Sequence, residues 1–137
     1  MPSNPFLKPI LFSENDGALS GQFWFGVDAD NKLLFQNTVG VSSIRKNVDE
    51  PLQEKLWLHV AVSLSTYNEL LFYINGFKHL STTLHSWQNP SNGPFGIGRL
   101  HNMSESEYYY FHGFLSDLYV FSRDLRPEEI GKIMGTY

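Results

Sequence analysis

The sequence contains no cysteine, which excludes disulfide bridges, thiolate metal sites and a cysteine nucleophile. No uninterrupted apolar run approaches the ~20 residues that a membrane-spanning helix needs. The net charge is −4 and the lysines and arginines are scattered, so the basic patch expected of a nucleic-acid-binding protein is absent. Pro5 and Pro9 interrupt the region where a signal peptide would carry a continuous apolar core, so none is predicted. We therefore expect neither a membrane span nor a nucleic-acid partner.

Aromatic residues are abundant, at 15% of the chain, with 11 Phe and 7 Tyr. Aromatic side chains favour strands, because they pack well on a pleated, half-buried surface. Gly and Pro occur singly along the whole length, as expected when many short strands require many turns. A chain of 137 residues is long enough for one domain with its own core, so residues 1–137 are predicted to form a single domain.

In the stretch 57–76 (WLHVAVSLSTYNELLFYING), the first half alternates, as in an antiparallel strand, and residues 69–74 are nearly all apolar, as in a central strand covered on both faces. Asn75-Gly76 can adopt the positive φ angles of a type I′ turn, which predicts a hairpin. A short helix is expected at 127–130, where a proline and two glutamates suit a helix start, and 45–55 is expected to be a polar loop or one helical turn. The predicted strands are 6–13, 22–28, 32–36, 38–44, 57–64, 69–74, 77–80, 95–98, 108–111 and 113–121.

Three pieces of the sequence, in order, resemble the laminin-G-like, concanavalin A-like family. They are WLHVA (57–61) followed by LFYING (71–76), FGIGR (95–99), and the closing FHGFLSDLYVFSRDLRPEEI (111–130). The resemblance implies a jelly roll, which is an all-β, two-sheet antiparallel β-sandwich with one short C-terminal helix. It also favours an extracellular or cell-surface location.

The sequence departs from the family pattern in two places. Arg126 stands where the family usually has a serine that caps the helix, so a weaker cap is expected. The family also begins with two further strands before a segment like 10–13. Their absence here would leave sheet edges with unpaired backbone groups. The N-terminal segment, a second copy or a neighbouring chain is therefore expected to cover those edges.

Enzymes occur on this fold, so acidic pairs were considered as glycosidase candidates. Glycoside cleavage needs two carboxyl groups that face each other across the scissile bond. Every candidate pair falls in a stretch expected to be a polar loop, which would not hold that geometry, and no nucleophile-elbow motif accompanies the histidines. No catalytic residue is therefore assigned. The pairs considered are Glu105 with Glu107, Asp28 with Asp30, and Asp49 with Glu50.

Metal binding rests on one short loop. Asp28 and Asp30 place oxygen ligands at alternate positions, as calcium prefers, but the glycine and the distal glutamate of an EF-hand are missing. We favour a role in the hairpin turn for both and keep calcium as the alternative. The five histidines lack metal-ligand spacing, and structural hydrogen bonding is expected for His59 and His112.

A ligand site is predicted in the loops. Trp24 and Trp57 are expected to pack in the core. Trp87 lies in a loop rich in amides and hydroxyls, so it either stacks on a sugar or anchors its own loop. Tyr109 should face away from Tyr108 and Tyr110. Asn102 begins a glycosylation-type triplet, which is frequent by chance. The candidate ligand-binding residues are His85, Trp87, Asn89, Asn92, His101, Asn102, Tyr108 and Tyr110.

Two functions follow. The first is a non-catalytic module that recognises a carbohydrate or a protein surface through the loops 14–21, 85–94 and 99–107. The second is an assembly protein whose incomplete sheet is completed by another copy or a partner chain through β-augmentation.

Overall fold

The computed structural model describes residues 10–14, 23–39, 42–84, 95–98, 111 and 113–135. These residues form β-strands and one C-terminal helix, and they group into two compact units. Unit 1 comprises the described parts of 1–52 and 87–118, and unit 2 those of 53–86 and 119–137. Within these residues the helix is too short and too polar to cross a bilayer.

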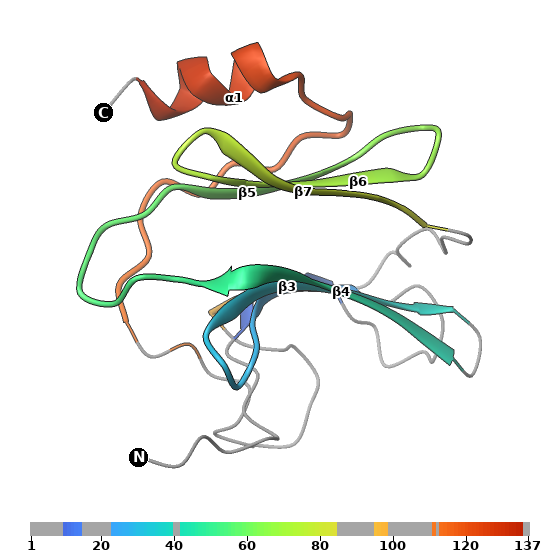
Figure 1. Cartoon of the computed structure of the whole chain (residues 1–137), viewed down its shortest axis with the longest axis horizontal. Coiled ribbons are helices and arrows are strands. Elements are labelled where there is room, and N and C mark those ends of the chain that lie inside the picture. Colours follow the sequence, from blue (N-terminus) through green and yellow to red (C-terminus); the bar gives the residue numbers. More distant parts are fainter. Residues whose placement is uncertain are drawn as a thin grey trace. The chain divides into compact units, whose positions relative to one another are not determined.

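Unit 1 is built on a five-stranded antiparallel sheet (Figure 1). The strand order is β4-β3-β2-β1-β8. The strands are β1 (Ile10–Glu14), β2 (Phe23–Val27), β3 (Lys32–Val39), β4 (Ser42–Pro51) and β8 (Phe95–Ile97).

The predicted hairpin between 22–28 and 32–36 is confirmed as β2 and β3. Phe25 pairs with Phe35, and Leu33 and Leu34 are fully buried beside it. Trp24 is also buried, as expected. Successive apolar residues of β3 are thus removed from water on both faces of the sheet, which is the main apolar burial of unit 1.

β4 corrects the prediction of a loop or helical turn at 45–55. Most of that stretch is strand, paired with β3 along almost its whole length. β4 is the outermost described strand of the sheet, and polar side chains are tolerated at such a position because the strand has a neighbour on one side only. Val48 supplies its buried apolar contact, and Pro51 ends the strand where no backbone N–H is needed. The polar composition of 45–55 predicted a loop, but a polar stretch can also form the outermost strand of a sheet.

Unit 2 holds a three-stranded antiparallel sheet and the helix, shown in green and red in Figure 1. The order is β5-β6-β7, and Leu70, Phe72 and Tyr73 of the central strand are fully buried. Asn75 and Gly76 have φ values of 51° and 81°, so the predicted turn is confirmed. The elements are β5 (Val60–Leu64), β6 (Glu69–Ile74), β7 (Phe77–Thr83) and α1 (Pro127–Met134).

Helix α1 starts at Pro127 as predicted, but it continues to Met134. Arg126 supplies no side-chain cap, as expected for a residue without a side-chain oxygen. Glu129 compensates, because its Oε1 accepts a hydrogen bond from the backbone N–H of Arg126 at 3.1 Å. The same carboxylate forms an ion pair with Arg123. Ile130 is the buried anchor of the helix.

The predicted last strand at 113–121 is wrong. These residues belong to no strand, and all of them are exposed. The alternating pattern is compatible with a strand, but a strand also needs a neighbouring strand to pair with its backbone. No described strand pairs with this stretch. Phe111, the described end of the predicted strand at 108–111, is also outside any strand, and 108–110 lie outside the described residues.

Gly76 and Gly131, both in unit 2, give a matched stability test. Gly76→Ala should lower the free energy of unfolding by about 1–2 kcal/mol, because the residue has φ of +81° and its new Cβ would lie 2.9 Å from the Met134 Cε. Gly131→Ala should raise it by about 0.5–1 kcal/mol, because the glycine is inside α1 and nothing lies within 4 Å of its Cβ position. Urea unfolding of both variants checks the signs. Equal effects would contradict this account of the turn.

The Glu129 cluster predicts a pH dependence. The Arg123 guanidinium, followed by the Arg126 backbone N–H, lowers the pKa of Glu129 from 4.5 to about 2. Because the folded-state pKa lies below the ordinary value, the stabilisation is fully present above about pH 4.5 and is lost as the pH falls toward about 2. The difference in thermal midpoint between wild type and Glu129→Gln should therefore shrink over that range. Glu128→Gln, which leaves the Arg123 pair intact, should show no such convergence.

Candidate functional site

All of the residues predicted to bind ligand lie outside the described part of the chain. The structure therefore describes the residues that flank these positions in the sequence, and not the positions themselves. The residues concerned are His85, Trp87, Asn89, Asn92, His101, Asn102, Tyr108 and Tyr110.

The stretch 99–110 is closed at its base. The backbone N–H of Phe111 donates to the carbonyl oxygen of Gly98 at 2.8 Å, so the chain leaves and returns at one point of unit 1. Gly98 has φ of +74°, a left-handed conformation that glycine adopts without strain, directly after β8. β8 is itself paired with β1. In the sequence, His101, Asn102, Tyr108 and Tyr110 lie between the two residues that this hydrogen bond joins.

The stretch 85–94 begins at an equally fixed point of unit 2. Leu84 is buried, and its backbone N–H donates to the carbonyl oxygen of Asn68 at 2.8 Å. Asn68 has φ of 62° in the turn between β5 and β6, so this hydrogen bond ties the end of β7 to that turn. His85 and Trp87 follow a residue that burial and hydrogen bonding both immobilise.

The Asp28 carboxylate organises the turn between β2 and β3. Oδ1 accepts hydrogen bonds from the backbone N–H groups of Asp30 at 2.8 Å and Lys32 at 3.0 Å. Oδ2 accepts from the side-chain amide of Asn47 on β4. The side chain is buried, so these donors replace the water that it loses on folding. Asp28 therefore joins the turn to the adjacent edge strand.

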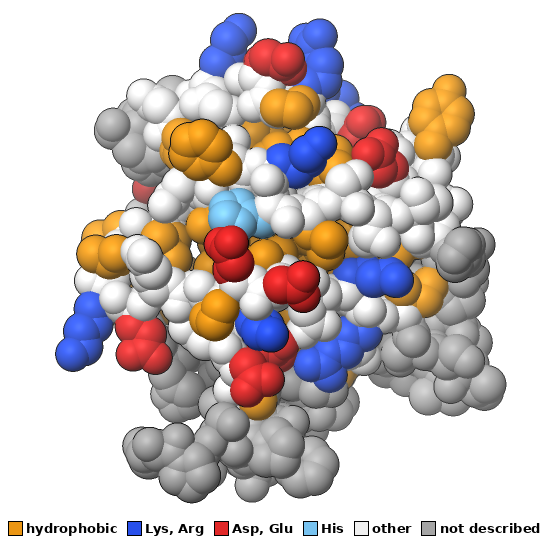
Figure 2. Space-filling model, in the orientation of Figure 1, with side chains coloured by type: hydrophobic (Ala, Val, Ile, Leu, Met, Phe, Trp, Pro, Cys, Tyr) orange, Lys and Arg blue, Asp and Glu red, His pale blue; other side chains and the backbone are white. Residues whose placement is uncertain are grey.

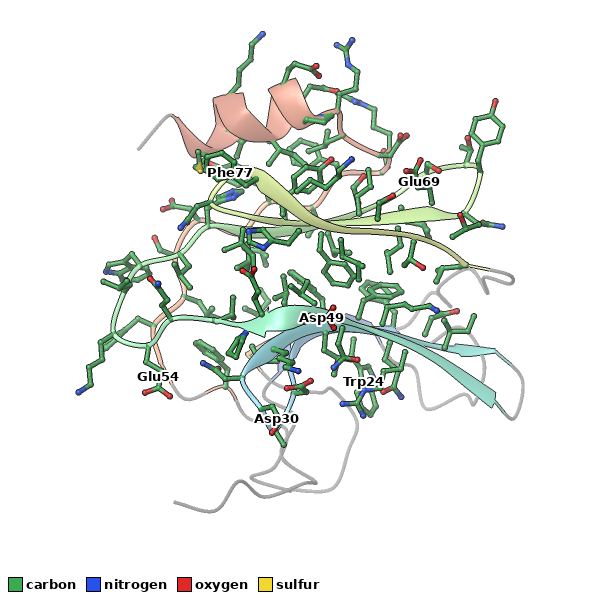
Figure 3. All side chains as sticks on the ribbon, viewed as in Figure 1. Trp24, Asp30, Asp49, Glu54, Glu69 and Phe77 are labelled. Atoms are coloured by element: carbon green, nitrogen blue, oxygen red, sulfur yellow. The ribbon has the colours of Figure 1, made fainter. Side chains whose placement is uncertain are left out.

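Asp30 lies at the tip of the same turn and is exposed (Figure 3). Among the described residues no group of three or more His, Cys, Asp or Glu side chains could hold a metal ion. Both oxygens of Asp28 already accept protein hydrogen bonds, which matches the turn role favoured from the sequence. Calcium at Asp28 and Asp30 stays a prediction.

The described members of the acidic pairs differ in burial. Asp49, labelled in Figure 3, and its neighbour Glu50 lie on β4 where its register against β3 shifts, and both are exposed. Asp28 is buried whereas Asp30 is exposed. Glu105 and Glu107 lie outside the described residues.

His59 is hydrogen-bonded through its backbone. Its N–H donates to the Asn75 Oδ1 at 2.9 Å, and its carbonyl oxygen accepts from the Asn75 N–H at 2.7 Å. Burial lowers the pKa of the ring, which favours a neutral imidazole. The Nδ1 atom is buried and has no hydrogen-bond partner among the described residues. His112 lies outside the described residues.

The prediction that Trp57 packs in the core is wrong. Its side chain is 71% exposed, beside the exposed Leu56, in the connection between β4 and β5. Trp57 precedes β5, which begins at Val60, so the strand does not hold it against the sheet. Lys55 in this connection has φ of 61°, a left-handed backbone conformation that the residue type does not predict. The sequence reasoning therefore missed an exposed aromatic surface in unit 2.

Charges on the visible face are mixed. Figure 2 shows acidic and basic side chains interspersed, with apolar side chains exposed among them. This surface lacks the single-sign field that steers polyanions toward a protein.

Comparisons with known proteins place the chain in a family. Among solved structures, a crystal structure of an S-layer domain-containing protein from Clostridium thermocellum is similar, with 26% sequence identity and a TM-score of 0.46. The alignment covers 98% of this chain and 66% of that chain, so this chain spans just under two thirds of the matched structure. No curated protein matches the sequence. The family model described as the concanavalin A-like lectin/glucanases superfamily, Laminin_G_3, matches residues 2–131. The predicted fold class is confirmed, and the chain belongs to the concanavalin A-like lectin/glucanase superfamily.

Proposed function

We propose that this protein is a non-catalytic binding module whose loops recognise a carbohydrate. The observation that carries the proposal is the closed base of 99–110, where Phe111 and Gly98 are joined by a backbone hydrogen bond. A recognition loop gains affinity when its ends are fixed, because less conformational freedom is lost on binding. The membership of a superfamily named for lectins supports the same function.

The composition of the loops supports a sugar as ligand. A pyranose presents an apolar C–H face and a rim of hydroxyl groups. Trp87, Tyr108 and Tyr110 offer aromatic surface with polar tips, and Asn89 and Asn92 offer amides that both donate and accept hydrogen bonds. None of these five residues carries a formal charge, which agrees with an uncharged ligand. Recognition of a protein surface is the other outcome that a binding screen can return.

The binding prediction is tested by a glycan array followed by calorimetric titration of the sugar that is retained. Trp87→Ala, and separately the double variant Tyr108→Ala with Tyr110→Ala, should each weaken binding at least about tenfold, which corresponds to about 1.4 kcal/mol. Tyr67→Ala is the matched control, because Tyr67 is 88% exposed in the turn between β5 and β6. It should bind as tightly as wild type.

Two results would contradict the binding prediction. One is the absence of binding to any sugar or candidate protein by a chain whose circular dichroism shows an intact β fold. The other is binding that is lost in Trp57→Ala and unchanged in the loop variants, which would move the site to the exposed aromatic of unit 2.

The same proposal predicts no hydrolase activity. Incubation with β-glucans should release no reducing ends above a protein-free control. Glu105 and Glu107 are the acids to test, because residues two apart on an extended chain share a face. Hydrolysis that disappears in Glu105→Gln or Glu107→Gln, while Asp49→Asn stays active, would replace the binding module by a glycosidase.

A further inference from the structure

Asn75 and Gly76 form the only described turn in which an asparagine with positive φ precedes a glycine. Their φ values are 51° and 81°, and Asn75 is exposed. The other described asparagines with positive φ are Asn31 and Asn68, and each is followed by a residue with a long side chain. These two are the control asparagines below. Because glycine has no Cβ, its backbone nitrogen can approach the carbonyl carbon of the preceding side chain without hindrance.

This approach allows an intramolecular reaction of the Asn75 side chain. The Gly76 nitrogen forms a bond to the Asn75 Cγ, the bond between Cγ and Nδ2 breaks, and the Gly76 N–H proton leaves with the amide as ammonia. The product is a cyclic imide, which water then opens. Addition of water at Cγ gives an aspartyl residue, and addition at the backbone carbonyl carbon gives an isoaspartyl residue. Nothing is oxidised or reduced.

The backbone N–H groups that would attack at the control asparagines are already bonded. The Lys32 N–H donates to the Asp28 Oδ1 at 3.0 Å, and the Glu69 N–H donates to the Ser65 Oγ at 3.1 Å. The control asparagines therefore share the backbone conformation of Asn75 but not its unhindered neighbour.

The closed turn holds the Asn75 side chain away from the reaction. Its Oδ1 accepts a hydrogen bond from the His59 N–H at 2.9 Å, and its own N–H donates to the His59 carbonyl oxygen at 2.7 Å. To reach the Gly76 nitrogen, the side chain must turn from His59 back toward its own main chain. The reaction therefore requires a local opening of the turn, and its rate follows the population of the open state.

The two products differ in what they leave of the turn. An aspartyl residue keeps a side-chain oxygen that the His59 N–H can bond. An isoaspartyl residue adds a methylene group to the main chain between positions 75 and 76. The two-residue connection between Ile74 and Phe77 has a fixed geometry, so it does not accommodate the longer chain. The hydrogen bonds to His59 are then lost, and with them the tie to the segment that enters β5.

We propose that Asn75-Gly76 is a self-modification site, at which deamidation is gated by opening of the turn between β6 and β7, and that its isoaspartyl product releases the segment that enters β5. This modification is beyond the carbohydrate-binding function and does not rest on it. The exposed Trp57 lies two residues before His59, in the segment that would be released.

Peptide mapping by mass spectrometry tests the site. The wild-type chain is incubated at neutral pH for several weeks, folded and unfolded in urea. Conversion of Asn75 should be detectable in the folded chain and at least about tenfold slower than in urea, which corresponds to an opening free energy of at least about 1.4 kcal/mol. The control asparagines should stay unmodified in the folded chain. Asn92-Gly93, the second Asn-Gly in the sequence, should react in urea at the rate of Asn75 and calibrates the unfolded chain.

Hydrogen exchange tests the gate without any substitution. The Asn75 N–H and side chain are both bonded to His59, so one opening frees both. The factor by which folding slows exchange of this N–H should therefore equal the factor by which folding slows deamidation.

Two variants at one position separate the backbone donor from the imidazole. His59→Pro removes the N–H that holds the Asn75 Oδ1 and keeps the carbonyl oxygen, so it should speed deamidation several-fold. His59→Ala keeps the N–H and should react as the wild type does. Circular dichroism shows whether the proline variant is folded, and the exchange comparison decides the gate if it is not.

The products are compared after separation by ion exchange. The isoaspartyl form should unfold at a lower urea concentration than the wild type, whereas Asn75→Asp should unfold close to it. An isoaspartyl form as stable as the wild type would overturn the released segment. Equal deamidation rates in the folded and unfolded chains would overturn the gate, and a folded chain that never converts would overturn the site. Sugar binding is measured on the unmodified fraction, so failure of one proposal does not decide the other.

Discussion

Asparagines in the left-handed backbone conformation set the strand register of this protein. Asn31, Asn68 and Asn75 have φ values of 62°, 62° and 51°, and each occupies the turn of one hairpin. An antiparallel strand must reverse within a few residues, and a slip of one residue would turn every side chain to the opposite face. Asparagine tolerates positive φ better than other non-glycine residues. The chain has no cysteine, so no disulfide bridge adds a further constraint on the register.

Side-chain and backbone hydrogen bonds extend the influence of the turns to distant parts of the chain. The Asn31 amide donates to the Leu52 carbonyl oxygen at 2.7 Å, which fixes the end of β4. Asn68 accepts from Leu84, which fixes the end of β7, and Asn75 bonds His59 through side chain and backbone. Each turn thus also positions the segment that enters or leaves a connecting loop.

Much of the fold could be predicted because its signals are local. The β2–β3 hairpin follows from alternation and the β6 strand from its nearly continuous apolar run. The Asn75-Gly76 turn follows from its residue types and the helix start from Pro127. The β4 strand was missed because an edge strand can be polar, and the strand at 113–121 failed because pairing depends on a partner far away in the sequence or on another molecule. Trp57 was misplaced for a similar reason, since only the start of β5 decides its burial. The loop residues predicted to bind ligand lie outside the described chain, and their ligand remains a proposal.

The hydrogen bond between Phe111 and Gly98 has an evolutionary consequence. It separates the sheet from whatever sequence lies between these two residues. Doubling the length of a flexible loop adds only about 0.6 kcal/mol of closure entropy. Insertions, deletions or exchanges between Gly98 and Phe111 should therefore cost the framework little free energy, so a new sequence could be grafted between these two residues while the strands stay as they are.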